Sequence, residues 1–171
     1  MSRTPAKVLL DRAAALAKPR HAQTTPTVSM LGFVLGEERF LSPLAPLREV
    51  TPVRRLTIIP GLPPLFAGLS NVRGAVVAVL DVRQVLGVET PRPEHPDAIL
   101  LIESDGATVA VWVDRLEGLA QVDLTTLRPD HGSSARWFKG RTNDLATVID
   151  LPAAVSAALT HITTDQPAEE A

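Results

Sequence analysis

The stretch LSNVRGAVVAVLDVRQVLG, residues 69–87, places an Asn-x-Arg-Gly turn directly before a run of apolar residues. Alanine, valine and leucine fill residues 75–80, and this composition favours a strand with two apolar faces. Asp81 ends the run, and apolar residues at helical spacing follow it. The stretch therefore predicts a turn, a buried strand and a short helix, in that order.

Short apolar runs elsewhere in the chain predict further strands. Gly36 and Gly106 each stand between two such runs, so each predicts a hairpin turn. Fifteen prolines and ten glycines among 171 residues, with little amphipathic helix, favour β-barrels or a sandwich over βαβ units. The predicted strands cover residues 28–35, 38–41, 75–80, 98–102, 109–113 and 145–149.

One pattern occurs twice in a weak form. VAVLDVRQVL (77–86) and LATVIDLPAAV (145–155) each combine an apolar strand, an aspartate and a segment with helical spacing. Asp81 and Asp150 occupy the position of an N-cap, where a carboxylate accepts backbone N–H groups at a helix start. Pro152 suits the first turn of the second helix, where its missing N–H costs nothing. We therefore expect two half-size β units.

The regions outside these strands predict flanking segments. Apolar residues recur at helical spacing over residues 7–18, and the proline that follows ends the pattern. Polar and proline-rich residues come next and predict a linker. We expect an N-terminal helix and linker over residues 1–27, a β-domain over residues 28–160 and a flexible C-terminal tail over residues 161–171.

Composition excludes several classes of protein. Apolar residues make up 45% of the chain, charged residues 21%, and the net charge is −2, which favours neither nucleic acid nor an anionic membrane as partner. The absence of cysteine excludes disulfides, thiolate zinc sites and cysteine nucleophiles. No secretory signal is visible, and prolines interrupt the longest uncharged stretch, residues 56–72, so we expect a cytoplasmic protein without membrane insertion.

The candidate catalytic residues form no recognisable constellation. Asp81, Asp114 and Asp150 each follow an apolar strand and could build a metal or acid–base site, but capping and turn formation is the preferred interpretation. No catalytic or metal motif is present, so we expect no enzymatic activity, no metal and no cofactor. The histidines stand apart from one another, without metal-ligand spacing, at His21, His95, His131 and His161.

Two interpretations of Arg73 stay open on local grounds. In one, Asn71 takes a strained turn geometry, Gly74 supplies a positive φ and Arg73 only solvates the loop. In the other, the donor fork of Arg73 reaches across a groove and binds carbonyl or carboxylate groups. Trp112 and Trp137 are expected to be core or barrel-corner residues, with a role of one of them as a partner-binding hot spot as the alternative.

Several motifs in the same order resemble the CheW family of chemotaxis adaptor domains. The resemblance covers roughly residues 28–155, and the Asn-x-Arg-Gly block carries most of its specificity. Two prolines, Pro43 and Pro46, depart from the family pattern near the first of these motifs. The matching blocks are Leu47-Arg48-Glu49-Val50, Pro60 with Pro63, Gly68-Leu69-Ser70-Asn71-Val72-Arg73-Gly74 and Asp81-Val82-Arg83.

The resemblance implies a mainly β fold of two packed five-stranded SH3-like barrels, with short helices and no enzymatic activity. It also implies a cytoplasmic adaptor at chemoreceptor arrays near the inner membrane. Its partners would be the cytoplasmic tip of a methyl-accepting chemoreceptor, docking near the turn, and the regulatory domain of a CheA-type histidine kinase. The implied partner-binding residues are Leu47, Glu49, Val50, Asn71, Arg73 and Gly74.

Two alternatives to this adaptor stay open. The first is a diverged auxiliary protein of the same family that binds only the kinase or only the receptor. The second is a β-domain that binds a small molecule, for which a rise in melting temperature with added ligand would be the evidence.

Overall fold

The computed structural model describes residues 27–53, 55–104, 106–129 and 135–165. The helix predicted over residues 7–18 and all but the last residue of the predicted linker lie outside the described residues. The described elements are β1 (Thr27–Leu35), β2 (Glu38–Pro43), β3 (Leu47–Thr51), β4 (Phe66–Val72), β5 (Ala75–Leu80), α2 (Arg83–Leu86), β6 (Ala98–Ser104), β7 (Ala107–Val113), β8 (Arg115–Asp123), η1 (Leu124–Thr126), β9 (Phe138–Arg141), β10 (Thr147–Ile149) and α3 (Leu151–Asp165).

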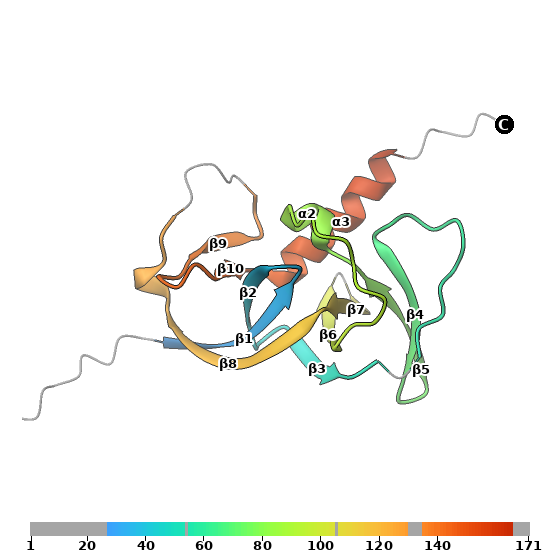
Figure 1. Ribbon diagram of the computed structural model, residues 1–171, viewed down its shortest axis with the longest axis horizontal. Helices are drawn as coiled ribbons and strands as arrows, with labels where there is room; N and C mark the ends of the chain where they lie inside the picture. The colour runs from blue at the N-terminus through green and yellow to red at the C-terminus, as the bar shows by residue number, and fades with distance from the viewer. Residues whose placement is uncertain (1–26, 54, 105, 130–134, 166–171) are drawn as a thin grey trace, which may run out of the picture.

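The described strands form two five-stranded sheets, so the mainly β fold predicted from the sequence is confirmed (Figure 1). The first sheet has the strand order β8-β1-β2-β10-β9, and the second has the order β3-β6-β7-β5-β4. Each sheet contains one parallel pair, β2 with β10 and β5 with β7, while the other pairs are antiparallel.

The two sheets repeat one arrangement of elements. The second sheet is built in chain order from β3, β4, β5, α2, β6 and β7, and the same places in the first sheet belong to β8, β9, β10, α3, β1 and β2. The repeated unit is therefore contiguous in the second sheet and divided between early and late strands in the first. The weak sequence repeat falls on equivalent elements, β5 with α2 and β10 with α3.

Each sheet curls so far that its two edges meet. The segment that follows one edge strand in the chain, β3 or β8, pairs with the strand at the opposite edge, β4 or β9. In the second sheet, Thr57 and Leu69 exchange two backbone hydrogen bonds of 2.8 Å. In the first sheet, Arg128 and Arg141 exchange bonds of 2.8 and 2.9 Å at the equivalent place. These bridges close both sheets into small barrels.

A glycine permits the close crossing at each bridge. Gly68 has a φ of +149°, and a Cβ there would lie 2.6 Å from the carbonyl oxygen of Thr57. Gly140 has a φ of +140°, and a Cβ there would lie 2.9 Å from Cβ of Leu127 and 3.2 Å from the carbonyl oxygen of Arg128. Both positions therefore require glycine for its backbone conformation and for the space it leaves.

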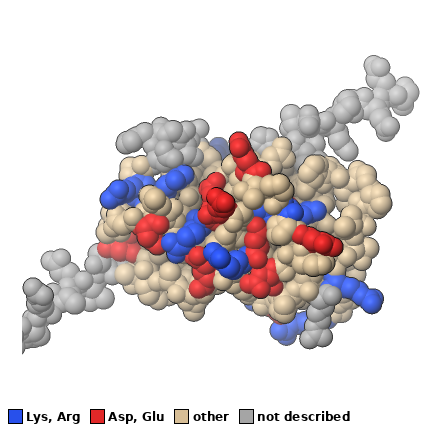
Figure 2. All heavy atoms as spheres, viewed as in Figure 1, with Lys and Arg blue, Asp and Glu red and all other residues tan. Residues whose placement is uncertain are grey.

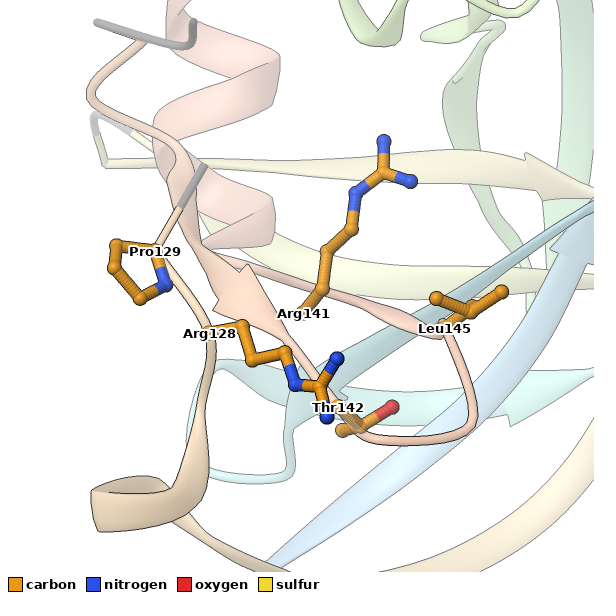
Figure 3. Close-up of a pocket in the computed structure, with 5 residues that line it drawn as sticks. All are labelled: Arg128, Pro129, Arg141, Thr142 and Leu145. Carbon is orange, nitrogen blue, oxygen red and sulfur yellow. The ribbon is translucent and has the colours of Figure 1, made fainter. Parts of the chain in front are cut away.

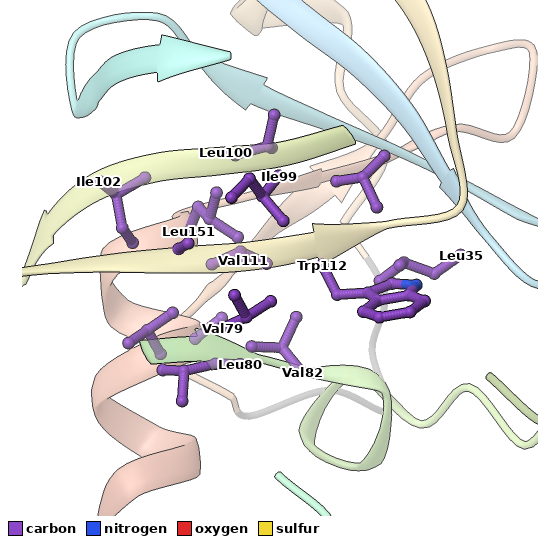
Figure 4. Close-up of a cluster of buried hydrophobic side chains, with 14 of the residues drawn as sticks. Leu35, Val79, Leu80, Val82, Ile99, Leu100, Ile102, Val111, Trp112 and Leu151 are labelled. Atoms are coloured by element: carbon purple, nitrogen blue, oxygen red, sulfur yellow. The ribbon is translucent and has the colours of Figure 1, made fainter. Parts of the chain in front are cut away.

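One continuous core fills the space between the two sheets and α3. The rings of Phe33 and Phe40 stack in the first sheet with centroids 5.8 Å apart. Trp112, with 1% of its surface exposed, lies beside Leu35 between the sheets (Figure 4). Leu151 and three further residues of α3 bury themselves in the same core. Burial of these apolar groups is the main stabilising force for the pair of barrels.

The C-terminal boundary differs from the prediction. Helix α3 continues to Asp165, so residues 161–165 belong to a helix rather than to the predicted tail. The apolar face of α3 packs against β6 and α2. No helix among the described residues has the length and apolarity needed to cross a membrane.

Candidate functional site

Arg73 and Gly74 form the two-residue turn between β4 and β5, because Val72 pairs directly with Ala75. Their φ angles are +52° and +88°, as hairpin turns with two left-handed central residues require. Asn71 Oδ1 accepts a hydrogen bond of 2.9 Å from the N–H of Gly74. The strained residue is thus Arg73, and the expectation that Asn71 takes the strained geometry is wrong.

The side chain of Arg73 reaches from this turn to the opposite edge of the sheet. Its Nε and Nη2 donate to Oε1 of Glu49 at 3.1 and 3.0 Å. Strands β3 and β4 are the two edge strands of the sheet, and their backbones are not paired with each other. The ion pair therefore connects the two edges through side chains. The Arg73 side chain is 79% exposed, and its remaining N–H donors face solvent.

Two residues on the strands next to this ion pair have exposed apolar side chains. Val50 follows Glu49 on β3, and Val76, 67% exposed, lies opposite Asn71 across the hairpin. We call Glu49, Val50, Asn71, Arg73 and Val76 the hairpin surface. The surface over β4 and the segment before it carries few charges (Figure 2). That segment adds three exposed apolar side chains, Ile58, Ile59 and Leu62.

The predicted partner-binding residues fall into two groups. Asn71, Arg73 and Gly74 form the turn, and Glu49 connects it to β3, where Val50 is exposed. Leu47, by contrast, is partly buried and packs against the main core. A substitution of Leu47 would therefore remove core packing together with any partner contact. Val76 was missed by the sequence analysis because its apolar strand predicted burial along its whole length.

A buried network of charged side chains joins the two sheets. Arg83 at the start of α2 donates through Nη1 to Oδ2 of Asp114 at 3.0 Å, through Nη2 to Oδ1 of Asp114, and through Nε to Oδ2 of Asp81 at 3.3 Å. Asp114, which follows β7 of the second sheet, also accepts the N–H of Gly36 in the first sheet at 2.7 Å. Nε1 of Trp112 donates to the same carboxylate at 2.8 Å.

The segment between α2 and β6 covers this network. The guanidinium carbon of Arg92 lies 4.9 Å from the centre of the Trp112 ring, and its Nη1 lies 3.8 Å from Oδ2 of Asp81. A Cβ at Gly36 would lie 2.7 Å from Cβ and Oγ1 of Thr90. The hairpin turn of the first sheet therefore packs tightly on this segment, and two arginines balance the two aspartates beneath it.

The two predicted helix caps differ in the structure. Asp150 Oδ1 accepts the N–H of Ala153 at 3.1 Å, in the manner of an N-cap residue directly before α3. Asp81 Oδ1 accepts the N–H of Arg83 at 3.1 Å, but the N-cap position of α2 belongs to Val82. The N-cap assignment of Asp81 is therefore corrected by one residue, and its ion pair with Arg83 was missed.

The environment of Asp114 favours its charged form. Burial alone raises the pKa of this carboxyl, but hydrogen bonds from Arg83, the Gly36 N–H and Trp112 outweigh burial. The pKa of Asp114 therefore lies below its ordinary value. A carboxylate that is already saturated with donors is suited to holding structure rather than to exchanging protons.

The three aspartates considered as a metal or acid–base site do not meet. Arg83 donates hydrogen bonds to both Asp81 and Asp114, whereas Asp150 pairs with Lys139 at 3.3 Å. Across the described ranges, no group of three or more histidine or acidic side chains is arranged to hold a metal ion. The exposed arginine on its strained turn, with apolar neighbours, is instead the kind of surface that another protein binds.

Comparisons with known proteins agree on one family. The family model for the CheW-like domain matches residues 29–159, more than half of the chain. Protein PilI of Pseudomonas aeruginosa is 27% identical over 128 residues, which are 72% of this chain and 72% of that protein. Chemotaxis protein CheW of Helicobacter pylori is 21% identical over 141 residues, 79% of this chain and 86% of that protein.

A solved structure shares the fold. The crystal structure of the scaffolding protein TtCheW from Thermoanaerobacter tengcongensis superposes with a TM-score of 0.64 at 22% identity. The match covers 75% of this chain and 92% of that one. The pair of barrels described above is therefore the fold of that scaffolding protein.

Proposed function

The chain belongs to the family of CheW-like domain proteins, and we propose that it is the adaptor between the cytoplasmic tip of a methyl-accepting chemoreceptor and the regulatory domain of a CheA-type histidine kinase. Proteins of this family are non-catalytic scaffolds, and the chain is a scaffold of chemotaxis or PilI-type signalling. Its place of action in this proposal is the receptor array at the inner membrane.

The observation that carries the proposal is the conformation of Arg73. A left-handed turn residue is most favourable as glycine or asparagine, and an arginine there costs free energy that the fold must supply. The side chain is nevertheless exposed and oriented by Glu49. Strained residues concentrate at binding sites, where the strain holds a group in the geometry that a partner needs.

The chemistry of the hairpin surface favours a helical partner. Val50 and Val76 offer apolar contacts, and the free donors of Arg73 offer hydrogen bonds to carbonyl or carboxylate oxygens. An amphipathic helix meets both requirements, because its apolar stripe is flanked by polar side chains. The helical tip of a chemoreceptor has this chemistry, and we assign it to the hairpin surface.

Calorimetric titration of the purified chain with each partner tests the proposal. The titrants are the kinase regulatory domain and a receptor cytoplasmic fragment from the same organism. Arg73→Asn is the informative variant, since asparagine keeps the left-handed turn and removes the guanidinium. We expect both partners to bind the wild type, and we expect the receptor fragment to bind Arg73→Asn at least tenfold more weakly.

Leu145→Asn is the matched control, because Leu145 also has a positive φ but lies in the turn between β9 and β10 of the first sheet. It should bind the receptor fragment as the wild type does. Binding of only one partner by the wild type would support the auxiliary protein instead of the adaptor. Equal receptor affinity of wild type and Arg73→Asn would remove Arg73 from the site.

A further inference from the structure

Residues 88–97, which we call the strap, connect α2 to β6 and are bonded to the rest of the protein at both ends. At the start, the N–H of Val88 donates to the carbonyl oxygen of Arg83 at 2.9 Å. At the end, the N–H of Asp97 donates to the carbonyl oxygen of Val113 at 3.1 Å. Between these two ends, no residue of the strap forms a hydrogen bond to another described residue. The position of its middle therefore depends on side-chain contacts.

Arg92 makes the charged contact between the middle of the strap and the rest of the protein. Its guanidinium carbon lies 4.9 Å from the centre of the Trp112 ring, and its Nη1 lies 3.8 Å from Oδ2 of Asp81. The Arg92 side chain is 29% exposed. Arg128 and Arg141, by contrast, are exposed and line an open pocket of about 330 Å³ in the first sheet (Figure 3). Arg92 is thus held partly out of solvent by an aromatic ring and a carboxylate.

Trp112 and Asp81 together have the chemistry that binds a guanidinium group. The face of an indole ring attracts a cation, and a carboxylate beside it supplies the opposite charge. The ring is fixed, because its Nε1 donates to Asp114 at 2.8 Å and it lies beside Leu35 in the core (Figure 4). Asp81 is 8% exposed. The core therefore forms this site, and Arg92 fills it from the strap.

The charges beneath the strap show why the site needs a cation. Asp81, Asp114 and Arg83 together carry one net negative charge, and their side chains are only 9%, 13% and 7% exposed. Arg92 balances that charge. An unbalanced charge so far from solvent is unfavourable. If Arg92 left the site, another cation would consequently be favoured in its place.

We propose that Trp112 and Asp81 form a binding site for a guanidinium group and that Arg92 is its built-in occupant. While Arg92 occupies the site, the strap is closed. When a guanidinium group of free arginine or of a partner protein takes its place, the middle of the strap is released. One cation–π contact favours the closed strap by only about tenfold, so a competing group can displace it. This inference does not depend on the identity of the partner at the hairpin surface.

Titration of Arg92→Ala with ethylguanidinium tests the site, because alanine leaves the site vacant. All proteins in the titration also carry Trp137→Phe, so that the fluorescence reports Trp112 alone. Arg115→Ala is the matched control, because Arg115 also lies 3.8 Å from a carboxylate oxygen, that of Glu117, but over no aromatic ring of the described chain. Sodium chloride at the same concentration controls for ionic strength.

We expect a saturable change of fluorescence in Arg92→Ala, at ethylguanidinium concentrations to which the Arg115→Ala control and the protein with Arg92 intact do not respond. The melting temperature of Arg92→Ala, measured without the Trp137 substitution, should rise over the same concentrations, because a ligand of the folded state stabilises it. The absence of a saturable change in Arg92→Ala overturns the proposal. An equal response of Arg115→Ala overturns it too, because the binding would then be unspecific.

Cleavage by glutamyl endopeptidase after Glu94 tests the release of the strap, because a protease cuts a segment that has opened. Arg92→Ala should be cut at least fivefold faster than wild type and Arg115→Ala. Equal cleavage rates of the three proteins would mean that Arg92 does not hold the strap, and would overturn the proposal.

Free L-arginine and N-acetylarginine amide, added to the wild type, distinguish the two sources of the guanidinium group. Because Arg92 competes, they should act at about tenfold higher concentration than is needed to saturate Arg92→Ala. Faster cleavage with both compounds is the result expected for an arginine side chain of a partner protein. Faster cleavage with L-arginine alone supports the free amino acid as the ligand. If neither compound speeds cleavage, a competing guanidinium does not release the strap and the proposal is wrong.

Discussion

The two sheets share one strand arrangement but hold different residues at one equivalent turn. Each has the same strand order, the same bridging contact and a glycine at the same crossing, Gly68 in the second sheet and Gly140 in the first. Each also carries one strained residue between its last two strands, but that residue is Arg73 in one sheet and Leu145 in the other. The two sheets therefore share glycine where the backbone requires it, and they differ at the turn residue whose side chain is exposed to solvent.

The largest effect is expected where the two sheets meet. Arg83→Met should lower the free energy of unfolding by about 3–5 kcal/mol, because Asp81 and Asp114 both lose the guanidinium that balances their charge at a site largely withdrawn from solvent. Denaturant unfolding measures the loss. Arg39→Met, which removes exposed ion pairs on the first sheet, is the control and should cost about 1 kcal/mol or less. Similar losses for the two variants would show that the buried network of Arg83, Asp81 and Asp114 does not hold the sheets together.

The equivalence of the two frames predicts two smaller losses of unequal size. Gly68→Ala should cost about 3 kcal/mol and Gly140→Ala about 2 kcal/mol, because both need a conformation that only glycine adopts easily. The new methyl group at Gly68 approaches a backbone oxygen at 2.6 Å, whereas the nearest atom to that at Gly140 is Cβ of Leu127 at 2.9 Å, with the backbone oxygen of Arg128 at 3.2 Å. Thermal unfolding of the two variants gives the comparison. Tolerance of either alanine would break the equivalence of the crossings.

The two strand-to-helix corners provide the next test. Asp150→Ala should cost about 1 kcal/mol as a lost N-cap, and Asp81→Ala about 2 kcal/mol, because Asp81 also pairs with buried Arg83. Denaturant midpoints at neutral pH are the measurement. Equal losses would mean that the ion pair between Asp81 and Arg83 adds nothing to stability.

Stability should change least at the two strained turns. Leu145→Asn should raise the free energy of unfolding by about 0.5 kcal/mol, since asparagine adopts a positive φ more readily than leucine. Arg73→Asn gains the same relief but loses the ion pair with Glu49, so its stability should stay within about 0.5 kcal/mol of wild type. A large loss in Arg73→Asn would mean that Arg73 is needed for the fold rather than for a partner.

Acid should reduce the stability that Asp114 contributes to the buried network between the sheets. The pKa of Asp114 is lowered in the folded state, so its contribution is complete above the ordinary value of 3.8 and is lost as the pH falls through the lower folded value. Unfolding midpoints of wild type and Asp114→Asn, measured down through this range, should converge as the pH falls. Parallel curves would contradict the assignment.

The sequence predicted the strands that are buried apolar runs, including β5, β6 and β7. It missed β8 (Arg115–Asp123), where charged residues and a glycine interrupt the apolar pattern, because pairing with β1 rather than local preference makes it a strand. It also predicted burial along all of β5, whereas Val76 at its start is exposed on the hairpin.

The candidate site shows the same division between local and distant signals. The turn was visible because Asn71, Arg73 and Gly74 are neighbours in sequence. The buried network around Asp114 was not visible in the sequence, because its hydrogen bonds join residues that are separated by 31 and by 78 positions. A clue was nevertheless present in Asp81-Val82-Arg83, since opposite charges two residues apart at the end of an apolar strand are compatible with a buried ion pair.

The division of the first sheet between early and late strands also sets an order of assembly on the ribosome. The second sheet is complete once β7 has emerged, because all its strands lie between Leu47 and Val113. Strands β1 and β2 are synthesised earlier, yet they wait for β8, β9 and β10 before their apolar faces are covered. The hairpin made first therefore finds its last neighbour only when Ile149 has left the exit tunnel, and until then it is the segment most in need of a chaperone.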